Sequence, residues 1–518
     1  MCLKPDQPLR SDWSVQQRAG FDYTLLTESA ARWVQAEATF TMIDRRRQIQ
    51  FGTDGWRAVI ADAFTFENVG RVTQAYACFL KEQVAPASTA PIFVGFDNRF
   101  LSDAFAGRVA SILLANGFPV ALFEHPVPTP IVSFAVKTNG SPGGVMITAS
   151  HNAAEYNGFK IKAPWGGSAT DAITRAVEGF LDREAVPSLS GLLPSSPNGV
   201  EAAYRARIEA LVDLERIRAA GLSVIIDSMH GSGGRMIESF LPGGRLKAET
   251  IRADRDVIFG GVAPEPIDCN LLPLKERVLA ARASLGLVTD GDADRLGAVD
   301  ELGQTMTLHA VVPILLAHLF KNRKMTGEVV FTVSQSVLMR RMCQAYNLRA
   351  LETAVGFKYI AEQMLKGDVL IGAEESGGIG VKGHIPERDG ILNALLLLEA
   401  VVVAGKKTSE IVADLHREFG AFYYERRDTR VQPEQGRRLI ESLLAGPPKS
   451  LCGMKVKEVS GKDGVKFIFD DESWLMLRQS GTEPVLRLYV EASSKQKTAA
   501  LLDEGVRDLV SRAAGISM

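Results

Sequence analysis

Three carboxylates at alternate positions, Asp290, Asp292 and Asp294, follow an apolar run that is typical of a buried strand. Such carboxylates repel one another unless a cation lies between them, and hard oxygen ligands favour Mg²⁺ or Mn²⁺. The spacing also opens an EF-hand calcium loop, but that loop needs glycine at its sixth position, where this chain has Arg295. The pattern therefore predicts a divalent-metal site, with a solvated acidic turn as the alternative.

A second polar loop, TASHN at 148–152, also follows an apolar run. Ser150 could act as a nucleophile, with His151 as its proton carrier or electrostatic partner. A serine in such a place more often caps the next segment, and the loop alone leaves that alternative open. Downstream, Lys160 could neutralise a phosphate or, if its pKa is lowered, transfer a proton.

Phosphate-binding groups gather in RQSGTEPVLR at 478–487. A glycine turn offers backbone N–H groups, two hydroxyls can donate, and two arginines can bind phosphate bidentately. An ordinary strand turn with surface arginines is the alternative. The density of donors predicts a phosphate clamp made by Arg478, Ser480, Gly481, Thr482 and Arg487.

Two further loops carry weaker signals. GAEESGG at 372–378 places Glu374 and Ser376 among glycines, which suits hydrogen bonding to sugar hydroxyls, although a solvated acidic turn fits equally well. FGTDGWR at 51–57 puts Arg57 after a glycine-rich turn, where it could bind an anion. No P-loop sequence occurs in the chain, so a nucleoside triphosphate is not the obvious donor in a phosphoryl transfer. The phosphate would reside most simply on Ser150 itself.

The composition is that of an ordinary globular protein, with 46% hydrophobic and 23% charged residues among 518. A net charge of −2 gives no electrostatic footprint for nucleic acid or an anionic membrane. The five cysteines show no metal-ligand spacing, the sequence MCLKPDQPLRSDWS shows no apolar signal segment, and no apolar stretch is long enough to span a bilayer. We therefore expect a cytoplasmic enzyme that binds neither nucleic acid nor membrane.

One pattern recurs three times: an apolar strand, a polar loop, a helix, and a second strand that ends in a loop of small and acidic residues. The first strands are expected at 92–99, 223–231 and 329–336, and α/β sheets bind ligands at such strand ends. Strand-rich sequence and a helix near Ser494 follow. The predicted fold is therefore α/β, with three related strand-helix-strand domains plus a C-terminal α+β domain around a central cleft. The predicted segments are an N-terminal extension at 1–48, domain I at 49–200, domain II at 201–304, domain III at 305–425 and domain IV at 426–518.

In chain order, FGTDGWR, TASHN, DGDADR, GAEESGG and RQSGTEP resemble the motifs of the α-D-phosphohexomutase family, which includes phosphoglucomutase and phosphomannomutase, over about residues 50–518. The resemblance implies that Ser150 is a phosphoserine that gives and receives phosphate. It implies that the three aspartates bind one Mg²⁺ per active site together with a phosphoserine oxygen, and that Arg295 stabilises the phosphoryl charge. The other implied roles are sugar recognition by Lys358, Glu374, Ser376 and Arg388, and proton or phosphoryl transfer by His151, Lys160 and Arg57.

The implied reaction interconverts glucose 1-phosphate and glucose 6-phosphate through a hexose 1,6-bisphosphate that turns within the cleft. Glu375 stands where the amino-sugar branch of the family more often carries glutamine, which disfavours glucosamine phosphate. The open alternatives are a phosphomannomutase or dual-specificity enzyme, a synthase that releases glucose 1,6-bisphosphate, and a non-catalytic sugar-phosphate sensor. Glucose 1,6-bisphosphate is expected as activator or intermediate, hexose phosphates as the partners, and a monomer or small homo-oligomer as the assembly.

Overall fold

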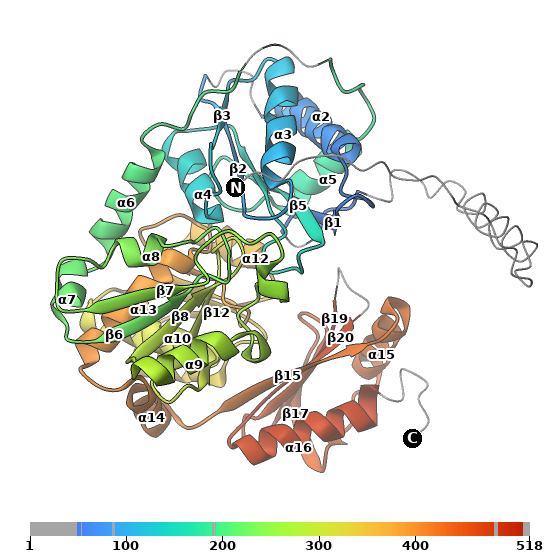
Figure 1. Cartoon of the computed structure of the whole chain (residues 1–518). Coiled ribbons are helices and arrows are strands. Elements are labelled where there is room, and N and C mark those ends of the chain that lie inside the picture. Colours follow the sequence, from blue (N-terminus) through green and yellow to red (C-terminus); the bar gives the residue numbers. More distant parts are fainter. Residues whose placement is uncertain are drawn as a thin grey trace, which may run out of the picture. The chain divides into compact units, whose positions relative to one another are not determined.

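A computed structural model describes residues 49–52, 54–84, 89–188, 191, 193–480 and 485–510 (Figure 1). The predicted N-terminal extension at 1–48 lies outside these described residues, as do Gly481 and Thr482 of the predicted phosphate clamp. Three α/β units and one antiparallel unit follow one another along the chain.

The first α/β unit has a five-stranded sheet in the order β1-β5-β4-β2-β3. β2 runs parallel to β3 and β4, whereas β5 and β1 add to the sheet in antiparallel fashion. β2 and β4 are buried along their whole length, which is typical of strands with helices on both faces. Its elements are β1 (Trp56–Val59), α2 (Phe66–Gln83), β2 (Ile92–Phe96), α3 (Ser102–Ala115), β3 (Val120–Leu122), α4 (Thr129–Thr138), β4 (Gly144–Ile147), β5 (Tyr156–Lys162) and α5 (Asp171–Gly179).

The second unit repeats this plan with the order β10-β9-β8-β6-β7. β6 runs parallel to β7 and β8, and β9 and β10 are the antiparallel additions. Its elements are α6 (Val200–Leu211), α7 (Leu214–Ala219), β6 (Ser223–Asp227), α8 (Met236–Ser239), β7 (Lys247–Ile251), η1 (Phe259–Gly261), η2 (Asp268–Asn270), α9 (Leu272–Ala281), β8 (Leu285–Thr289), β9 (Leu296–Asp300) and β10 (Thr305–Met306).

The third unit keeps the first four strands of the plan, in the order β12-β11-β13-β14. β11 runs parallel to β12 and β13, and β14 is antiparallel to β13. Its apolar helix α13 contacts both α10 and β8, so the second and third units share one hydrophobic core. Its elements are α10 (Leu308–Ala317), η3 (His318–Asn322), β11 (Glu328–Thr332), α11 (Val337–Ala345), β12 (Ala350–Thr353), α12 (Phe357–Lys366), β13 (Val369–Ala373), β14 (Ile379–Val381), α13 (Gly390–Ala404) and α14 (Thr408–Phe419).

The last unit is a six-stranded antiparallel sheet in the order β15-β20-β19-β18-β17-β16. Its last α-helix begins after Ser494, whose Oγ accepts a hydrogen bond from Lys497 N, as the sequence predicted. Its elements are β15 (Tyr423–Arg430), α15 (Pro433–Ala445), β16 (Ser450–Leu451), β17 (Met454–Ser460), β18 (Val465–Phe469), β19 (Trp474–Gln479), β20 (Val485–Ala492), α16 (Lys495–Gly505) and η4 (Val506–Val510).

Three of the predicted functional loops follow equivalent strands of the three α/β units. The serine loop (148–152) follows β4, the metal loop (290–294) follows β8, and the sugar loop (374–378) follows β13. Each of these strands is the one of its three parallel strands that also pairs with an antiparallel strand. The same strand order therefore puts the three loops at equivalent places in the three sheets. The prediction of three related α/β domains plus a C-terminal α+β domain is confirmed. The boundaries and the central cleft stay predictions, and β15 begins at Tyr423, before the predicted start of domain IV at 426.

Candidate active site

The three aspartates of the metal loop lie together and are fully buried after β8. One carboxylate oxygen from each lies within 4.8 Å of the others. Among the residues that the structure describes, Asp292 Oδ1 and Asp294 Oδ1 have no hydrogen-bond partner. Burial, together with the charges of Asp292 and Asp294, raises the pKa of Asp290 well above its ordinary value. Buried hard oxygen donors that repel one another and keep unpaired oxygens fit a divalent cation such as Mg²⁺. Their burial is incompatible with the alternative of a solvated turn.

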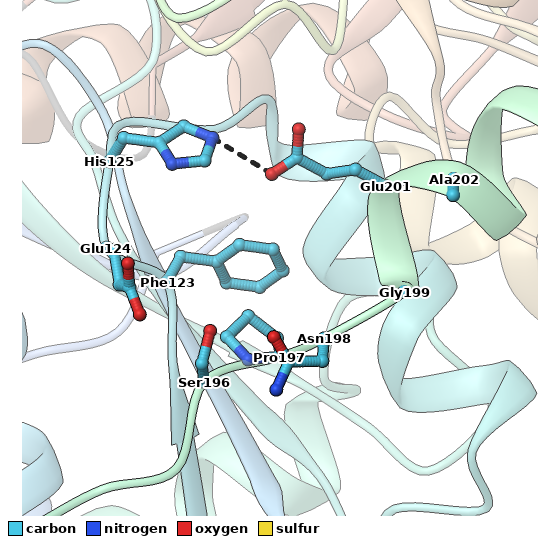
Figure 2. A pocket seen from close by; sticks show the side chains of 9 residues that line it. All are labelled: Phe123, Glu124, His125, Ser196, Pro197, Asn198, Gly199, Glu201 and Ala202. Atoms are coloured by element: carbon cyan, nitrogen blue, oxygen red, sulfur yellow. Dashed lines mark ion pairs between the residues drawn. The ribbon is translucent and has the colours of Figure 1, made fainter.

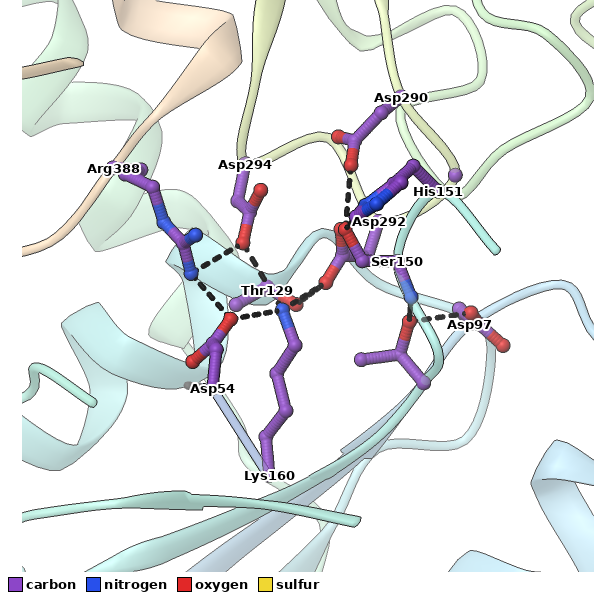
Figure 3. Close-up of polar contacts among 12 residues, drawn as sticks. Asp54, Asp97, Thr129, Ser150, His151, Lys160, Asp290, Asp292, Asp294 and Arg388 are labelled. Carbon is purple, nitrogen blue, oxygen red and sulfur yellow. Dashed lines mark hydrogen bonds and ion pairs between the residues drawn. The ribbon is translucent and has the colours of Figure 1, made fainter. Parts of the chain in front are cut away.

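Ser150 lies directly against the metal loop. Its Oγ donates to Asp290 Oδ2 at 2.7 Å (Figure 3). The two loops approach so closely that a Cβ at Gly291 would lie 2.4 Å from the Ser150 carbonyl oxygen, and therefore only glycine fits there. No helix begins at the serine loop, so Ser150 does not cap one. The structure brings the predicted nucleophile and the predicted metal ligands into one site.

His151 and Arg57 lie beside Ser150. His151 Nδ1 lies 3.3 Å from Ser150 Oγ. Burial and the charges of Arg295 and Arg57 lower the pKa of His151 well below its ordinary value, so its imidazole is neutral and can accept a proton. Arg57 extends from β1 and donates to Asn152 Oδ1 at 2.6 Å. Both predicted residues therefore contact the serine loop or its nucleophile.

Arg295 lies at the other end of the metal loop. Its Nε is 4.0 Å from Asp290 Oδ2 and 3.9 Å from Asp294 Oδ1, and this Nε makes no hydrogen bond within the described residues. The Arg295 backbone N–H donates to Asp290 Oδ1 at 3.1 Å. A buried guanidinium with a donor to spare can bind an incoming anion. Its position is compatible with the role that the sequence resemblance implied.

Lys160 occupies the centre of a buried ion cluster (Figure 3). Its Nζ lies 2.8 Å from Asp292 Oδ2, 3.0 Å from Asp294 Oδ2 and 2.8 Å from Asp54 Oδ2. Burial alone would lower the pKa of Lys160, but these three carboxylates raise it above its ordinary value. The condition for proton transfer by Lys160, a lowered pKa, is therefore not met. Lys160 instead holds the Oδ2 oxygens of two aspartates and leaves their Oδ1 oxygens for a metal.

Arg388, predicted to bind substrate, is surrounded by carboxylates of the protein. Its side chain is 4% exposed, and its Nη2 lies 2.5 Å from Asp54 Oδ2 and 2.9 Å from Asp294 Oδ2. Its Nη1 lies 4.0 Å from Glu374 Oε2. Arg388 thus links the first, second and third units, and its contact with a sugar stays a prediction. Sequence reasoning missed Asp54, although it stands in the same motif as Arg57.

The sugar loop presents one buried and two partly buried polar side chains. Burial raises the pKa of Glu374 to about 7, although the charge of Arg388 acts in the opposite direction. Glu375 accepts a hydrogen bond of 2.6 Å from Ser334 Oγ, and Ser376 is partly buried. Lys358, at the start of α12, forms an ion pair of 2.5 Å with Asp171 of the first unit.

The arginines of the phosphate clamp lie side by side on the antiparallel sheet. Arg478 in β19 is the register partner of Arg487 in β20. Arg478 Nε donates to Asp463 Oδ2 at 2.9 Å, and the same oxygen accepts from Val355 N at 2.9 Å. Asp463 therefore connects the clamp to the loop before Lys358, and motif reasoning did not find it. Ser480 is buried at the end of β19.

Two surface pockets contain none of the predicted site residues. One, of about 220 Å³, is lined partly by an exposed ion pair of 2.9 Å between His125 and Glu201 (Figure 2). The other, of about 480 Å³, surrounds the ion pair between His318 and Glu399. The chemistry described above gathers at the strand-end loops instead.

Comparison with known families matches all four units. The family described as phosphoglucomutase/phosphomannomutase matches residues 48–186 with its α/β/α domain I, 202–303 with domain II, 309–419 with domain III and 430–508 with its C-terminal domain. The chain belongs to the α-D-phosphohexomutase family. The resemblance inferred from the motifs is thereby confirmed.

Named relatives of this phosphohexomutase span several sugars. It is 29% identical over 459 residues to a phosphoglucomutase/phosphomannomutase of Thermococcus kodakarensis, covering 88% of this chain and 97% of that protein. It is 30% identical over 460 residues to a phosphoglucosamine/phosphogalactosamine mutase of Sulfurisphaera tokodaii, with the same shares. A crystal structure from Thermus thermophilus, provisionally assigned as a phosphomannomutase, is 35% identical with a TM-score of 0.79, covering 89% of this chain and 99% of that one. Within the described part of the phosphohexomutase, no helix is both long and apolar enough to cross a bilayer.

Proposed function

We propose that this phosphohexomutase interconverts glucose 1-phosphate and glucose 6-phosphate in the cytoplasm, with Ser150 as the phosphate carrier and one Mg²⁺ held by the metal loop. The observation that supports it most is the hydrogen bond of 2.7 Å between Ser150 Oγ and Asp290, inside a cluster of three buried carboxylates. A serine in that position can carry a phosphate beside the cation that neutralises it.

Substrate binding would divide between the sugar loop and the phosphate clamp. Arg478 and Arg487 present two guanidinium groups on one sheet face, which suits the non-reacting phosphate of a hexose phosphate. Glu374, as a carboxylate, accepts hydrogen bonds from sugar hydroxyls, and Ser376 can donate or accept one. Holding both ends of the substrate places its free hydroxyl against the serine loop.

The transfer itself exchanges one P–O bond for another. The bond from phosphorus to Ser150 Oγ breaks while a bond to the free sugar hydroxyl forms. The hydroxyl proton passes to the neutral imidazole of His151, which lies 3.3 Å from Ser150 Oγ and returns a proton to that departing oxygen. Bound Mg²⁺ supplies charge neutralisation for the phosphoryl group. Arg295, beside the metal loop, and Arg57, beside the serine loop, stabilise the charge on the moving phosphoryl group. The bisphosphate then turns over, and its other phosphate returns to Ser150 Oγ by the reverse steps.

A mass measurement tests the phosphate carrier. We expect the intact protein to carry one phosphate on Ser150, and glucose 1-phosphate to remove it. Ser150→Ala should abolish both the phosphate and the isomerisation. Ser141→Ala is a matched control, because Ser141 is equally buried in the first unit but its Oγ bonds to the backbone of Pro91 and Gly143 and not to the metal loop. Substantial turnover by Ser150→Ala would refute the proposal, and a phosphate that the sugar cannot remove would favour the sensor.

The names of the relatives favour other hexose phosphates as second candidates. A coupled assay at equal concentrations of glucose, mannose and glucosamine 1-phosphates would rank them. If a quenched reaction accumulates free glucose 1,6-bisphosphate as its main product, the enzyme is a synthase of the bisphosphate instead.

A further inference from the structure

The backbone of Ser150 is strained. Its φ of 53° lies in the left-handed region, where a residue with a side chain is disfavoured. Such a conformation persists only when the surroundings enforce it. The serine loop must therefore be held by groups outside itself.

Arg99, just after β2, supplies one part of that support. Its guanidinium donates to four carbonyl oxygens of the chain around Ser150: Ser150 at 2.6 Å, Asn152 at 2.5 Å, Ala153 at 2.7 Å and Tyr156 at 3.0 Å. The planar fork of arginine fits such a convergence of acceptors, and a lysine ammonium does not reproduce it. One side chain thus fixes the path of the chain through and beyond the nucleophile.

Asp97, at the start of the same turn, supplies the other part. Its Oδ2 lies 3.2 Å from Arg99 Nε and accepts from Thr148 Oγ1 at 2.6 Å. Thr148 Oγ1 in turn accepts from Ser150 N at 2.8 Å. Arg99 thus holds the carbonyl group of Ser150, and Asp97 holds its N–H group through Thr148.

The side chains of Asp97, Arg99 and Thr148 are too deeply buried to contact substrate. Asp97, Arg99 and Thr148 have exposed fractions of 0%. The ring of Phe259, from the second unit, lies over the Arg99 guanidinium at 4.9 Å. Any effect of these residues on transfer is therefore indirect, and their hydrogen bonds act on the position of Ser150.

The three α/β units repeat this relation between two loops. In the second unit, Ser232 N, after β6, donates to Gly291 O of the metal loop at 3.0 Å. In the third, Ser334, after β11, donates to Glu375 of the sugar loop at 2.6 Å. In each unit, the loop after the first parallel strand (β2, β6 or β11) thus bonds to the loop after the third parallel strand in the chain (β4, β8 or β13). The first unit does so with the charged residues Asp97 and Arg99.

We propose that Asp97 and Arg99 are positioning residues that hold Ser150 in the conformation from which it gives and receives phosphate. The inference rests on the proposed role of Ser150 as the carrier. Without Arg99 the left-handed conformation relaxes and Ser150 Oγ leaves its place beside the metal loop. A misplacement of about 1 Å lowers a transfer rate about 100-fold.

The test compares variants of the full-length enzyme at a temperature where circular dichroism shows each of them to be folded. Arg99→Met and Thr148→Val should each lower kcat, about 100-fold for Arg99→Met, with KM within about twofold of the parent, because substrate recognition lies on other loops. Arg99→Lys should recover only part of the loss. Arg71→Met is the matched control: Arg71 is also buried in the first unit and binds Asp182 with two hydrogen bonds, but far along the chain from the serine loop. It should lower the melting temperature without changing kcat.

Single-turnover loss of phosphate from Ser150, followed by intact mass after rapid quenching, measures the transfer step directly. Rates within twofold of the parent for Arg99→Met or Thr148→Val would overturn the inference, as would equal losses of kcat in Arg99→Met and Arg71→Met. If Arg99→Met does not fold, Thr148→Val alone decides. If the parent carries no phosphate, the proposed function fails, and hydrogen exchange decides the positioning role: Arg99→Met should speed exchange at the amides of 148–156 and Arg71→Met should not.

Discussion

Glu374 should make the capture of hexose phosphate dependent on pH. Burial raises the pKa of its carboxyl from an ordinary 4.5 to about 7, and only the ionised form accepts hydrogen bonds with both oxygens. With a pKa of about 7, roughly one-tenth of the free enzyme is ionised at pH 6 and roughly nine-tenths at pH 8. At saturating Mg²⁺, kcat/KM should therefore fall about tenfold from pH 8 to pH 6, because kcat/KM reports the free enzyme. kcat should change less, because bound sugar hydroxyls stabilise the carboxylate.

The control is Glu374→Gln, which can accept and donate hydrogen bonds but does not titrate. The substrate phosphate also ionises near pH 6, and that ionisation affects both proteins alike. The ratio of kcat/KM between parent and variant, measured by quenched assay at half-unit steps from pH 5.5 to 8.5, isolates Glu374. A ratio that stays constant over this range would refute the reasoning.

The same pKa shift affects stability, with a definite sign. Because the folded pKa is raised, the folded state binds more protons than the unfolded state between pH 4.5 and about 7. The stabilisation is therefore complete below pH 4.5 and is lost as the pH rises through about 7. At about 1.36 kcal/mol per pH unit, the loss is about 3 kcal/mol. Urea unfolding should show that the free energy of unfolding falls by less in Glu374→Gln than in the parent between pH 5 and pH 8.

Two further perturbations test the ion clusters. Lys160→Met should destabilise the metal-free protein by about 3–5 kcal/mol, the cost of removing one partner from a buried ion pair. Calorimetry with EDTA and then with excess Mg²⁺ should show partial recovery by the metal, and an equal loss in both conditions would contradict the charge-balancing role of Lys160. Asp463→Asn should raise KM for glucose 1-phosphate by more than it lowers kcat, because Arg478 loses its ionic partner. Initial-rate measurements, with Glu472→Gln in the same unit as the control, would check this prediction. An unchanged KM would contradict it.

The loops that carry chemistry could be predicted from the sequence because each is continuous. In the serine, metal and sugar loops, the functional side chains stand within a few positions of one another at the end of an apolar strand. Local spacing is therefore enough to suggest both the ligand chemistry and its place at a strand end. The threefold repeat of an apolar strand followed by a polar loop also predicted the three related sheets.

The supports of these loops could not be predicted in the same way, because they join distant parts of the chain. Arg388 meets Asp54 across 334 positions. The family resemblance implied substrate binding by Arg388, and the sequence does not show that carboxylates from two other units also surround it. The pKa of Lys160 is a similar case: burial alone would have lowered it, and the carboxylates that raise it come from positions 54, 292 and 294.

Charge balance explains why these supports accompany the metal loop. The loop brings three carboxylates into a buried site and Asp54 adds a fourth, whereas the directly bonded cations are Lys160 and Arg388. Two negative charges remain, and the raised pKa of Asp290 shows that the protein alone does not accommodate both. A divalent cation would cancel them. The proposed phosphate on Ser150 would add about two more, and Arg57 and Arg295, which lie beside the serine and metal loops, would then meet it. Lys160 is buried at the centre of this cluster and its pKa is raised by three carboxylates, which fits a fixed positive charge better than a proton carrier.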